Sequence, residues 1–146
     1  MEVDMFISSA RATGIESGND RGIREVRMTF LSVDDSVTIR KIVSLALKGA
    51  GHTVVEAGNG KEGLEALKIV KADCIILDIN MPEMNGIEFL KARKTDPRIS
   101  RIPVIVLTTQ DEDALKNQAL ALGASGFIAK PFQKDALLAT IKAIAG

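Results

Sequence analysis

The chain has 146 residues, of which 46% are hydrophobic and 26% are charged, and its 19 basic side chains balance 19 acidic ones. This composition excludes a disordered chain and predicts one domain with a sizeable core. The zero net charge argues against direct nucleic-acid binding, because proteins that neutralise phosphate backbones usually carry an excess of basic residues.

The single cysteine and single histidine exclude an internal disulfide and a zinc site built from these residue types. No apolar run reaches the roughly 18 residues that a membrane-spanning helix needs. The N-terminus lacks the basic start and apolar stretch of a secretory signal. We therefore expect a cytoplasmic protein that does not insert into a membrane.

Residues 1–27 differ in pattern from the rest of the chain. Charges of both signs are mixed there with serines and with Gly14, Gly18 and Gly22, which interrupt any helical or strand period. We interpret this segment as a flexible N-terminal extension, or as a start-site artefact with Met28 as the true initiator. Residues 28–146 are predicted to form the one folded domain.

From Thr29 onward, short apolar runs alternate with segments of helical spacing. The runs predicted as strands are Thr29–Val33, Thr53–Val55, Cys74–Leu77, Val104–Leu107 and Phe127–Ala129. The third and fourth are continuously apolar, as expected of strands covered on both faces. The apolar residues predicted to share one helix face, turned toward the core, are Ile39, Ile42, Val43 and Ala46 in the first helix, Leu115, Ala119 and Leu122 in the fourth, and Leu137, Leu138, Ile141, Ile144 and Ala145 in the fifth. This alternation predicts an α/β protein with an open, doubly wound parallel sheet.

Polar side chains stand at the ends of four predicted strands. They are Asp34 and Asp35 after the first, Asp78 after the third, Thr108 after the fourth and Lys130 after the fifth. The carboxyl ends of parallel strands meet at one edge of the sheet, where ligands bind. Each residue alone has an ordinary explanation, such as a helix cap for Asp34 or a solvated surface lysine for Lys130. Their convergence predicts a site that handles phosphate or a metal ion.

The residue types at this edge narrow the chemistry. Crowded carboxylates repel one another unless a cation lies among them. Carboxylate and carbonyl oxygens suit Mg²⁺, which also engages phosphate oxygens. A carboxylate beside Mg²⁺ can attack phosphorus to give an acyl phosphate, and phosphoryl transfer needs mainly positioning and neutralisation of charge. Mg²⁺, Lys130 and a threonine hydroxyl would supply that neutralisation.

These residues stand in motifs that resemble the receiver domain of two-component response regulators, especially stand-alone CheY-like receivers. The motifs are Asp34-Asp35-Ser36, the run LDINMPEMNG at 77–86, Thr108, and Lys130-Pro131-Phe132. The resemblance covers residues 29–146, and its specificity lies in the four motifs occurring in this order and spacing. It implies a flavodoxin-like (βα)5 fold with five parallel strands in the order 2-1-3-4-5.

The resemblance also implies roles for individual residues. Asp78 is expected to be the phosphoacceptor, which takes a phosphoryl group from the phosphohistidine of a histidine kinase. Asp34, Asp35 and Asp78, with the backbone carbonyl of Asn80, are expected to hold Mg²⁺. Lys130 is expected to pair with the phosphoryl group.

Further features of the family concern switching and local backbone. Thr108 is expected to move toward the phosphoryl group, and Phe127 to move inward with it. Phe127 stands where many receivers carry tyrosine, although an ordinary core phenylalanine explains it equally well. The peptide bond before Pro131 is expected to be cis, and Gly86 to allow the loop after the acceptor through a positive φ.

We therefore expect a single-domain response regulator that is not an enzyme beyond catalysing its own phosphorylation and dephosphorylation. No residues follow the fifth helix beyond Gly146, so the expected output is a protein-binding face formed by the fourth helix, fifth strand and fifth helix. The expected partners are a histidine kinase, CheA-like or other, and a downstream protein, in chemotaxis or a related phosphorelay.

Two other classes of protein fit these residues less well. An aspartate-nucleophile phosphatase of small phosphomonoesters usually has a second aspartate two residues after the nucleophile as general acid, and position 80 is asparagine. A flavin-binding protein would need a phosphate-cradling loop after the first strand, where Asp34 and Asp35 would repel phosphate. It would also favour aromatic stacking partners, and the chain has five Phe but no Trp or Tyr.

Overall fold

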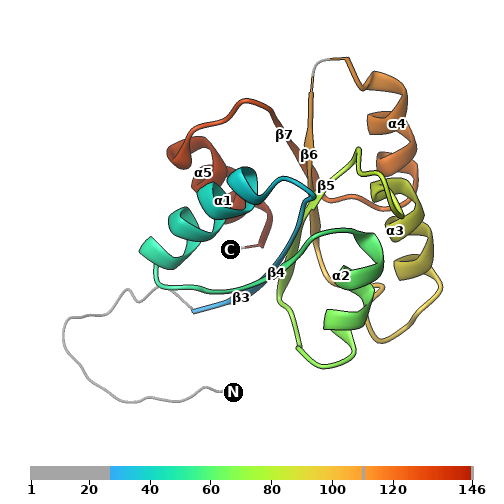
Figure 1. Ribbon diagram of the computed structural model, residues 1–146, viewed down its shortest axis with the longest axis horizontal. Helices are drawn as coiled ribbons and strands as arrows, with labels where there is room; N and C mark the ends of the chain where they lie inside the picture. The colour runs from blue at the N-terminus through green and yellow to red at the C-terminus, as the bar shows by residue number, and fades with distance from the viewer. Residues whose placement is uncertain (1–26, 110, 146) are drawn as a thin grey trace.

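The computed structural model describes residues 27–109 and 111–145. The predicted N-terminal extension, residues 1–27, lies outside the described residues except for its last member. In the described part, parallel strands form one five-stranded sheet in the order β4-β3-β5-β6-β7 (Figure 1). In chain order this is 2-1-3-4-5, so the predicted doubly wound fold is confirmed.

The strands are short; the first has its predicted bounds, and each of the other four differs from its prediction by one or two residues at one end. They are β3 (Thr29–Val33), β4 (Thr53–Ala57), β5 (Cys74–Asp78), β6 (Val104–Thr108) and β7 (Gly126–Ala129). Asp78 pairs with Leu107, and Thr108 pairs with Ala129, so both polar residues belong to their strands. The apolar runs predicted for β5 and β6 stop one residue too early, because backbone pairing, not side-chain polarity, defines where a strand ends.

Helices connect the strands and cover both faces of the sheet. They are α1 (Val37–Gly49), α2 (Gly60–Leu67), α3 (Gly86–Lys94), α4 (Asp113–Ala121) and α5 (Lys134–Ala145). The side chains of Ser36, Asn59 and Asn85 cap α1, α2 and α3 by accepting a hydrogen bond from a backbone N–H of the first turn. Among the described residues, none of the helices combines the length and apolar character needed to cross a bilayer.

The core consists of two apolar clusters, one on each face of the sheet. Helices α1 and α5 lie on one face of the sheet, and α2, α3 and α4 lie on the other (Figure 1). Strand residues such as Phe30 and Ile76 belong to the cluster on the first face, and Val33 and Leu77 belong to the cluster on the second. Burying both faces explains why β5 and β6 are fully buried along their length.

One predicted core position in the first helix is wrong. Ile42 is 42% exposed, whereas Val43, Ala46 and Leu47 are buried against the sheet. The buried stripe of α1 is centred between these three residues, which leaves Ile42 at its edge. Apolar spacing alone did not separate the centre of the stripe from its margin.

Candidate functional site

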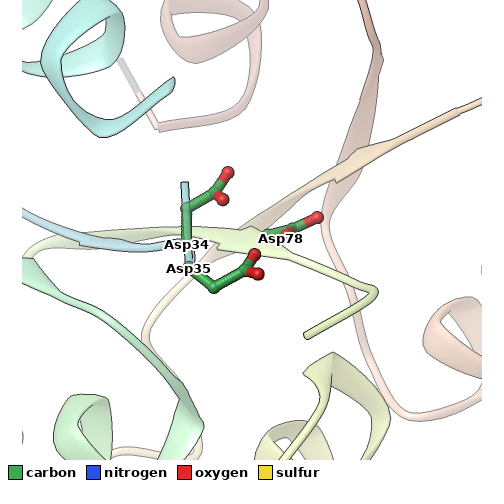
Figure 2. Close-up of side chains that lie close together, drawn as sticks. All are labelled: Asp34, Asp35 and Asp78. Carbon is green, nitrogen blue, oxygen red and sulfur yellow. The ribbon is translucent and has the colours of Figure 1, made fainter. Parts of the chain in front are cut away.

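Three carboxylates meet where β3 and β5 end (Figure 2). Val33 pairs with Leu77 in the sheet, so Asp34, which follows β3, lies level with Asp78 at the end of β5. Asp35 is next along the chain, and one oxygen from each of the three carboxylates lies within 4.8 Å of the others. Asp34 and Asp78 are buried, while Asp35 is exposed. The structure thus brings together the three aspartates that the sequence analysis singled out.

Lys130 follows β7, an edge strand of the sheet, and its side chain reaches this cluster. Its backbone N–H donates to the carbonyl oxygen of Thr108 at 2.8 Å, which continues the pairing of β7 with β6 for one more residue. Its ammonium Nζ lies 2.9 Å from Oδ1 of Asp78 and 3.6 Å from Oδ2 of Asp34. The peptide bond from Lys130 to Pro131 is cis, as the resemblance implied.

The close packing of these charges shifts their pKa values. Burial, reinforced by the charge of Asp34, raises the pKa of Asp78 to about 6 despite the opposing hydrogen bond from Lys130. Burial also disfavours the charge on Lys130, but the hydrogen bond and charge of Asp78, with the charges of Asp34 and Glu112, outweigh it and raise the Lys130 pKa. One ammonium therefore does not fully compensate the aspartates, and Asp78 ionises less readily than an ordinary aspartate.

The donor atoms of this cluster fit a hard divalent cation. Oδ1 of Asp34 accepts a hydrogen bond from the backbone N–H of Ser36 at 2.9 Å, but Oδ2 of Asp34 is buried and accepts none among the described residues. A buried carboxylate oxygen without a donor is costly. Mg²⁺ prefers such oxygens, keeps several waters, and would neutralise the remaining negative charge. Asp34, Asp35 and Asp78 are the residues that would hold it.

Asn80 lies just after β5, at the open side of the cluster. Its backbone N–H is 3.5 Å from Oδ1 of Asp78, which is a long contact, and its side chain is exposed. The chain therefore turns around the Asp78 carboxylate immediately after the strand. This position is compatible with the expected role of the Asn80 carbonyl as a fourth protein ligand.

Thr108 ends β6 beside the cluster, but its hydroxyl is engaged elsewhere. Thr108 is 4% exposed, and its Oγ1 lies 3.1 Å from Oε1 of Glu112 and 3.2 Å from the carbonyl oxygen of Thr109. The same Oε1 accepts a 2.8 Å hydrogen bond from the Thr109 backbone N–H. The predicted switch threonine is thus held toward the loop that leads into α4.

Phe127 is half-buried in β7 and packs against the cluster that α2, α3 and α4 cover. The ammonium Nζ of Lys116, on α4, lies 5.1 Å from the centre of its ring. At this distance a cation attracts the negative face of an aromatic ring. The ring therefore has a polar neighbour on α4 although it lacks a tyrosine hydroxyl.

Three residues near the site were not identified from the sequence. Glu112 and Lys116 contact the two predicted switch residues. Arg40, on α1, donates to the carbonyl oxygen of Asp34 at 2.5 Å and to Glu56 at 3.0 Å, and so ties the acidic loop to α1 and β4. In the sequence each of these three is only a charged residue near a predicted helix start. Such residues are common in helices of every kind, so they do not mark a site.

Gly86 begins α3, at the end of the loop that follows Asp78. Its φ is not among the positive values, so the predicted reason for this glycine is wrong; the positive φ in this loop belongs to Met84, at 46°. A Cβ atom at position 86 would lie 2.7 Å from Cα of Ile79 and 2.9 Å from the carbonyl oxygen of Asp78. Gly86 is needed because the backbone after Asp78 passes too close for a side chain.

Replacing Gly86 with alanine is therefore expected to displace the backbone that follows Asp78 and to lower the free energy of unfolding by about 1–3 kcal/mol. Urea unfolding measures this change. The matched control is Gly49→Ala, at the end of α1, where a new Cβ would meet nothing within 4 Å. That variant should be neutral or more stable by about 0.5–1 kcal/mol. Equal stabilities for the two variants would contradict the steric explanation.

Comparisons with known proteins agree with this geometry. A family model described as response regulator receiver domain matches residues 30–142. The chemotaxis protein CheY1 of Helicobacter pylori is 38% identical over 122 residues, which cover 82% of this chain and 98% of that protein. Protein PilH of Pseudomonas aeruginosa is 36% identical over 115 residues, covering 79% and 95%. The crystal structure of the Vibrio cholerae chemotaxis protein CheY4 at low pH superposes with a TM-score of 0.77 at 38% identity, covering 82% and 99%.

Proposed function

Because this chain belongs to the response regulator receiver domain family, we propose that it is a phosphorylation-dependent switch whose phosphoacceptor is Asp78. Membership of the family makes it a phosphoacceptor signalling protein of a two-component system rather than a conventional enzyme.

A single observation carries the assignment of Asp78. It is the one buried carboxylate that ends a central strand, lies within 4.8 Å of two further aspartates, and has an ammonium 2.9 Å from its Oδ1. Asp34 is also buried, but one of its oxygens is already occupied by the Ser36 N–H. Asp35 is exposed and lies outside the strand. Of these three, only Asp78 lies within a strand and accepts a hydrogen bond from the Lys130 ammonium, which is farther from Asp34, at 3.6 Å.

Each residue of the site has its own role in phosphoryl transfer. A carboxylate oxygen of Asp78 forms a bond to phosphorus while the P–N bond of the donor phosphohistidine breaks, and the electron pair of that bond stays on the imidazole. Bound Mg²⁺, held by Asp34, Asp35, Asp78 and the Asn80 carbonyl, would neutralise phosphoryl oxygens. Lys130 neutralises a further part of this charge, because its ammonium already contacts the acceptor carboxylate.

The output of this switch is proposed to be a protein-binding face formed by α4, β7 and α5. β7 is an edge strand of the sheet, and α4 carries Lys116 and Leu120 on its exposed side, with Leu120 59% exposed. Thr108 and Phe127 connect the acceptor edge to this face, because Thr108 ends β6 and Phe127 lies in β7 with its ring beside Lys116 of α4. A histidine kinase supplies the phosphoryl group, and a downstream protein, of chemotaxis or a related relay, reads the face.

Incubation with Mg²⁺ and acetyl phosphate, followed by intact mass measurement, tests the acceptor assignment. We expect one phosphoryl adduct on the wild-type chain and none on Asp78→Asn. Asp111→Asn, an exposed carboxylate in the loop before α4, is the matched control and should keep the adduct. An adduct of equal yield on Asp78→Asn would discard the assignment, and release of inorganic phosphate from many phosphomonoesters would favour a phosphatase instead.

A further inference from the structure

Glu112 occupies an unusual position for a helix-capping residue. It stands at the N-cap of α4, yet its side chain makes no capping hydrogen bond to that helix. Instead the carboxylate turns back to the end of β6, where Oε1 accepts hydrogen bonds from the Thr109 backbone N–H at 2.8 Å and from the Thr108 hydroxyl at 3.1 Å. The first turn of α4 therefore lacks a side-chain cap, because this carboxylate binds the end of β6 instead.

The donors around Glu112 favour its charged form. Burial opposes ionisation, but hydrogen bonds from the Thr109 backbone N–H and from the side chains of Thr108, Thr109 and Asn80 hold the Glu112 pKa below its usual value. A hydrogen bond to an ionised acceptor is stronger than one between neutral groups. The hydroxyl of Thr108 therefore has a strong acceptor on the side of α4, and its rival acceptor there is a neutral carbonyl.

A threonine hydroxyl carries one proton and can donate to one acceptor at a time. If Thr108 is to donate to a phosphoryl oxygen on Asp78, it must first leave Glu112. The hydrogen bond to Glu112 therefore opposes the arrangement that phosphorylation is proposed to stabilise.

We propose that Glu112 is a positioning residue that holds the Thr108 hydroxyl in the unphosphorylated arrangement and so sets how readily the switch responds. This inference rests on the proposed role of Asp78. The phosphoryl group must be a stronger hydrogen-bond acceptor for Thr108 than Glu112 is. Only then is α4 released from the end of β6. Removing the Glu112 carboxylate shifts the population toward the arrangement in which Thr108 has left Glu112, and it leaves the Asp78 carboxylate itself unchanged.

The first measurement follows Thr108 in the protein without phosphodonor or metal. Side-chain scalar couplings of Thr108, measured by NMR, report its χ1 rotamer. We expect one dominant rotamer in the wild-type chain and rotamer averaging in Glu112→Ala. Asp111→Ala removes the same charge from an exposed position in the same loop and should leave the couplings unchanged. Identical couplings in the wild-type chain and Glu112→Ala would overturn the proposal.

The second measurement titrates beryllofluoride, which mimics a phosphoryl group on an aspartate, in the presence of Mg²⁺ and follows amide NMR signals. Losing one hydrogen bond in the competing state predicts half-saturation at a concentration about three- to tenfold lower in Glu112→Ala. Glu112→Gln keeps an acceptor oxygen without the charge, so an intermediate value is expected. In a Thr108→Val background the effect of Glu112→Ala should largely disappear, because the competing hydroxyl is gone.

The outcomes separate this inference from the proposed function. Failure of beryllofluoride to bind the wild-type chain would contradict the role of Asp78, while the rotamer measurement would still test Glu112. Normal binding with an unchanged half-saturation in Glu112→Ala would overturn the role of Glu112 alone. An equal effect in the Thr108→Val background would also overturn it, because the effect would then arise from charge without the hydroxyl.

Discussion

Replacing Lys130 with alanine is expected to slow phosphorylation of Asp78 by acetyl phosphate roughly 100- to 1,000-fold, the usual cost of removing one group that stabilises charge in a transition state. Lys130 is the only cationic side chain among the described residues that forms an ion pair with Asp78. Its ammonium lies 2.9 Å from the acceptor oxygen and 3.6 Å from Asp34. Without it, the incoming phosphoryl oxygens meet uncompensated carboxylates.

A time course of intact mass with Mg²⁺ and acetyl phosphate measures this rate. Lys130→Arg keeps the positive charge but not the compact ammonium, so its rate should fall between those of the wild-type chain and Lys130→Ala. The control is Lys134→Ala, an exposed lysine in the first turn of α5, which should react at the wild-type rate. A Lys130→Ala rate within about threefold of wild type would show that the metal alone supplies the neutralisation.

The second large effect concerns stability and pH in the absence of metal. The pKa of Asp78 is raised in the folded chain to about 6, from an ordinary value of 3.8. The folded state therefore holds the Asp78 proton more tightly than the unfolded state does. Stability from this group is complete below pH 4 and is lost as the pH rises from about 4 through 6. This direction is opposite to that of an aspartate stabilised by a salt bridge.

Asp78→Asn removes the ionisation and should therefore be more stable than the wild-type chain at pH 8 with EDTA, by up to about 3 kcal/mol. The difference should shrink toward zero near pH 4, where the wild-type Asp78 is protonated. Urea unfolding of both proteins between pH 4 and pH 8 measures it. Asp111→Asn, an exposed carboxylate, should show a difference that does not grow with pH.

Adding Mg²⁺ at pH 8 should reduce or reverse this difference, because the cation stabilises the ionised carboxylate in the folded chain only. The same experiment therefore reports on the proposed metal site through stability, independently of phosphorylation. If Mg²⁺ stabilised both proteins equally, Asp78 would not be a ligand. If Asp78→Asn were less stable than wild type at every pH, the ion pair with Lys130 would outweigh the cost of burying Asp78.

Much of the fold was predictable from local sequence. Continuous apolar runs such as Val104–Leu107 signal strands covered on both faces, and their alternation with helical spacing allows few topologies. The errors are local. Apolar spacing puts Ile42 on the buried face of α1, because spacing does not identify the centre of an apolar stripe. The positive φ predicted for Gly86 is wrong, because a close approach of backbone to backbone leaves no trace in the sequence.

The sequence by itself determined which residues stand at the ends of the strands, and hence that Asp34, Asp35, Asp78, Thr108 and Lys130 would meet at one edge. It could do so because the carboxyl ends of parallel strands must lie side by side. Only the tertiary structure decided what holds these side chains. Glu112 reaches Thr108, and Lys116 reaches the ring of Phe127. These contacts depend on where α4 packs and which way its side chains turn, and no spacing along the chain encodes either.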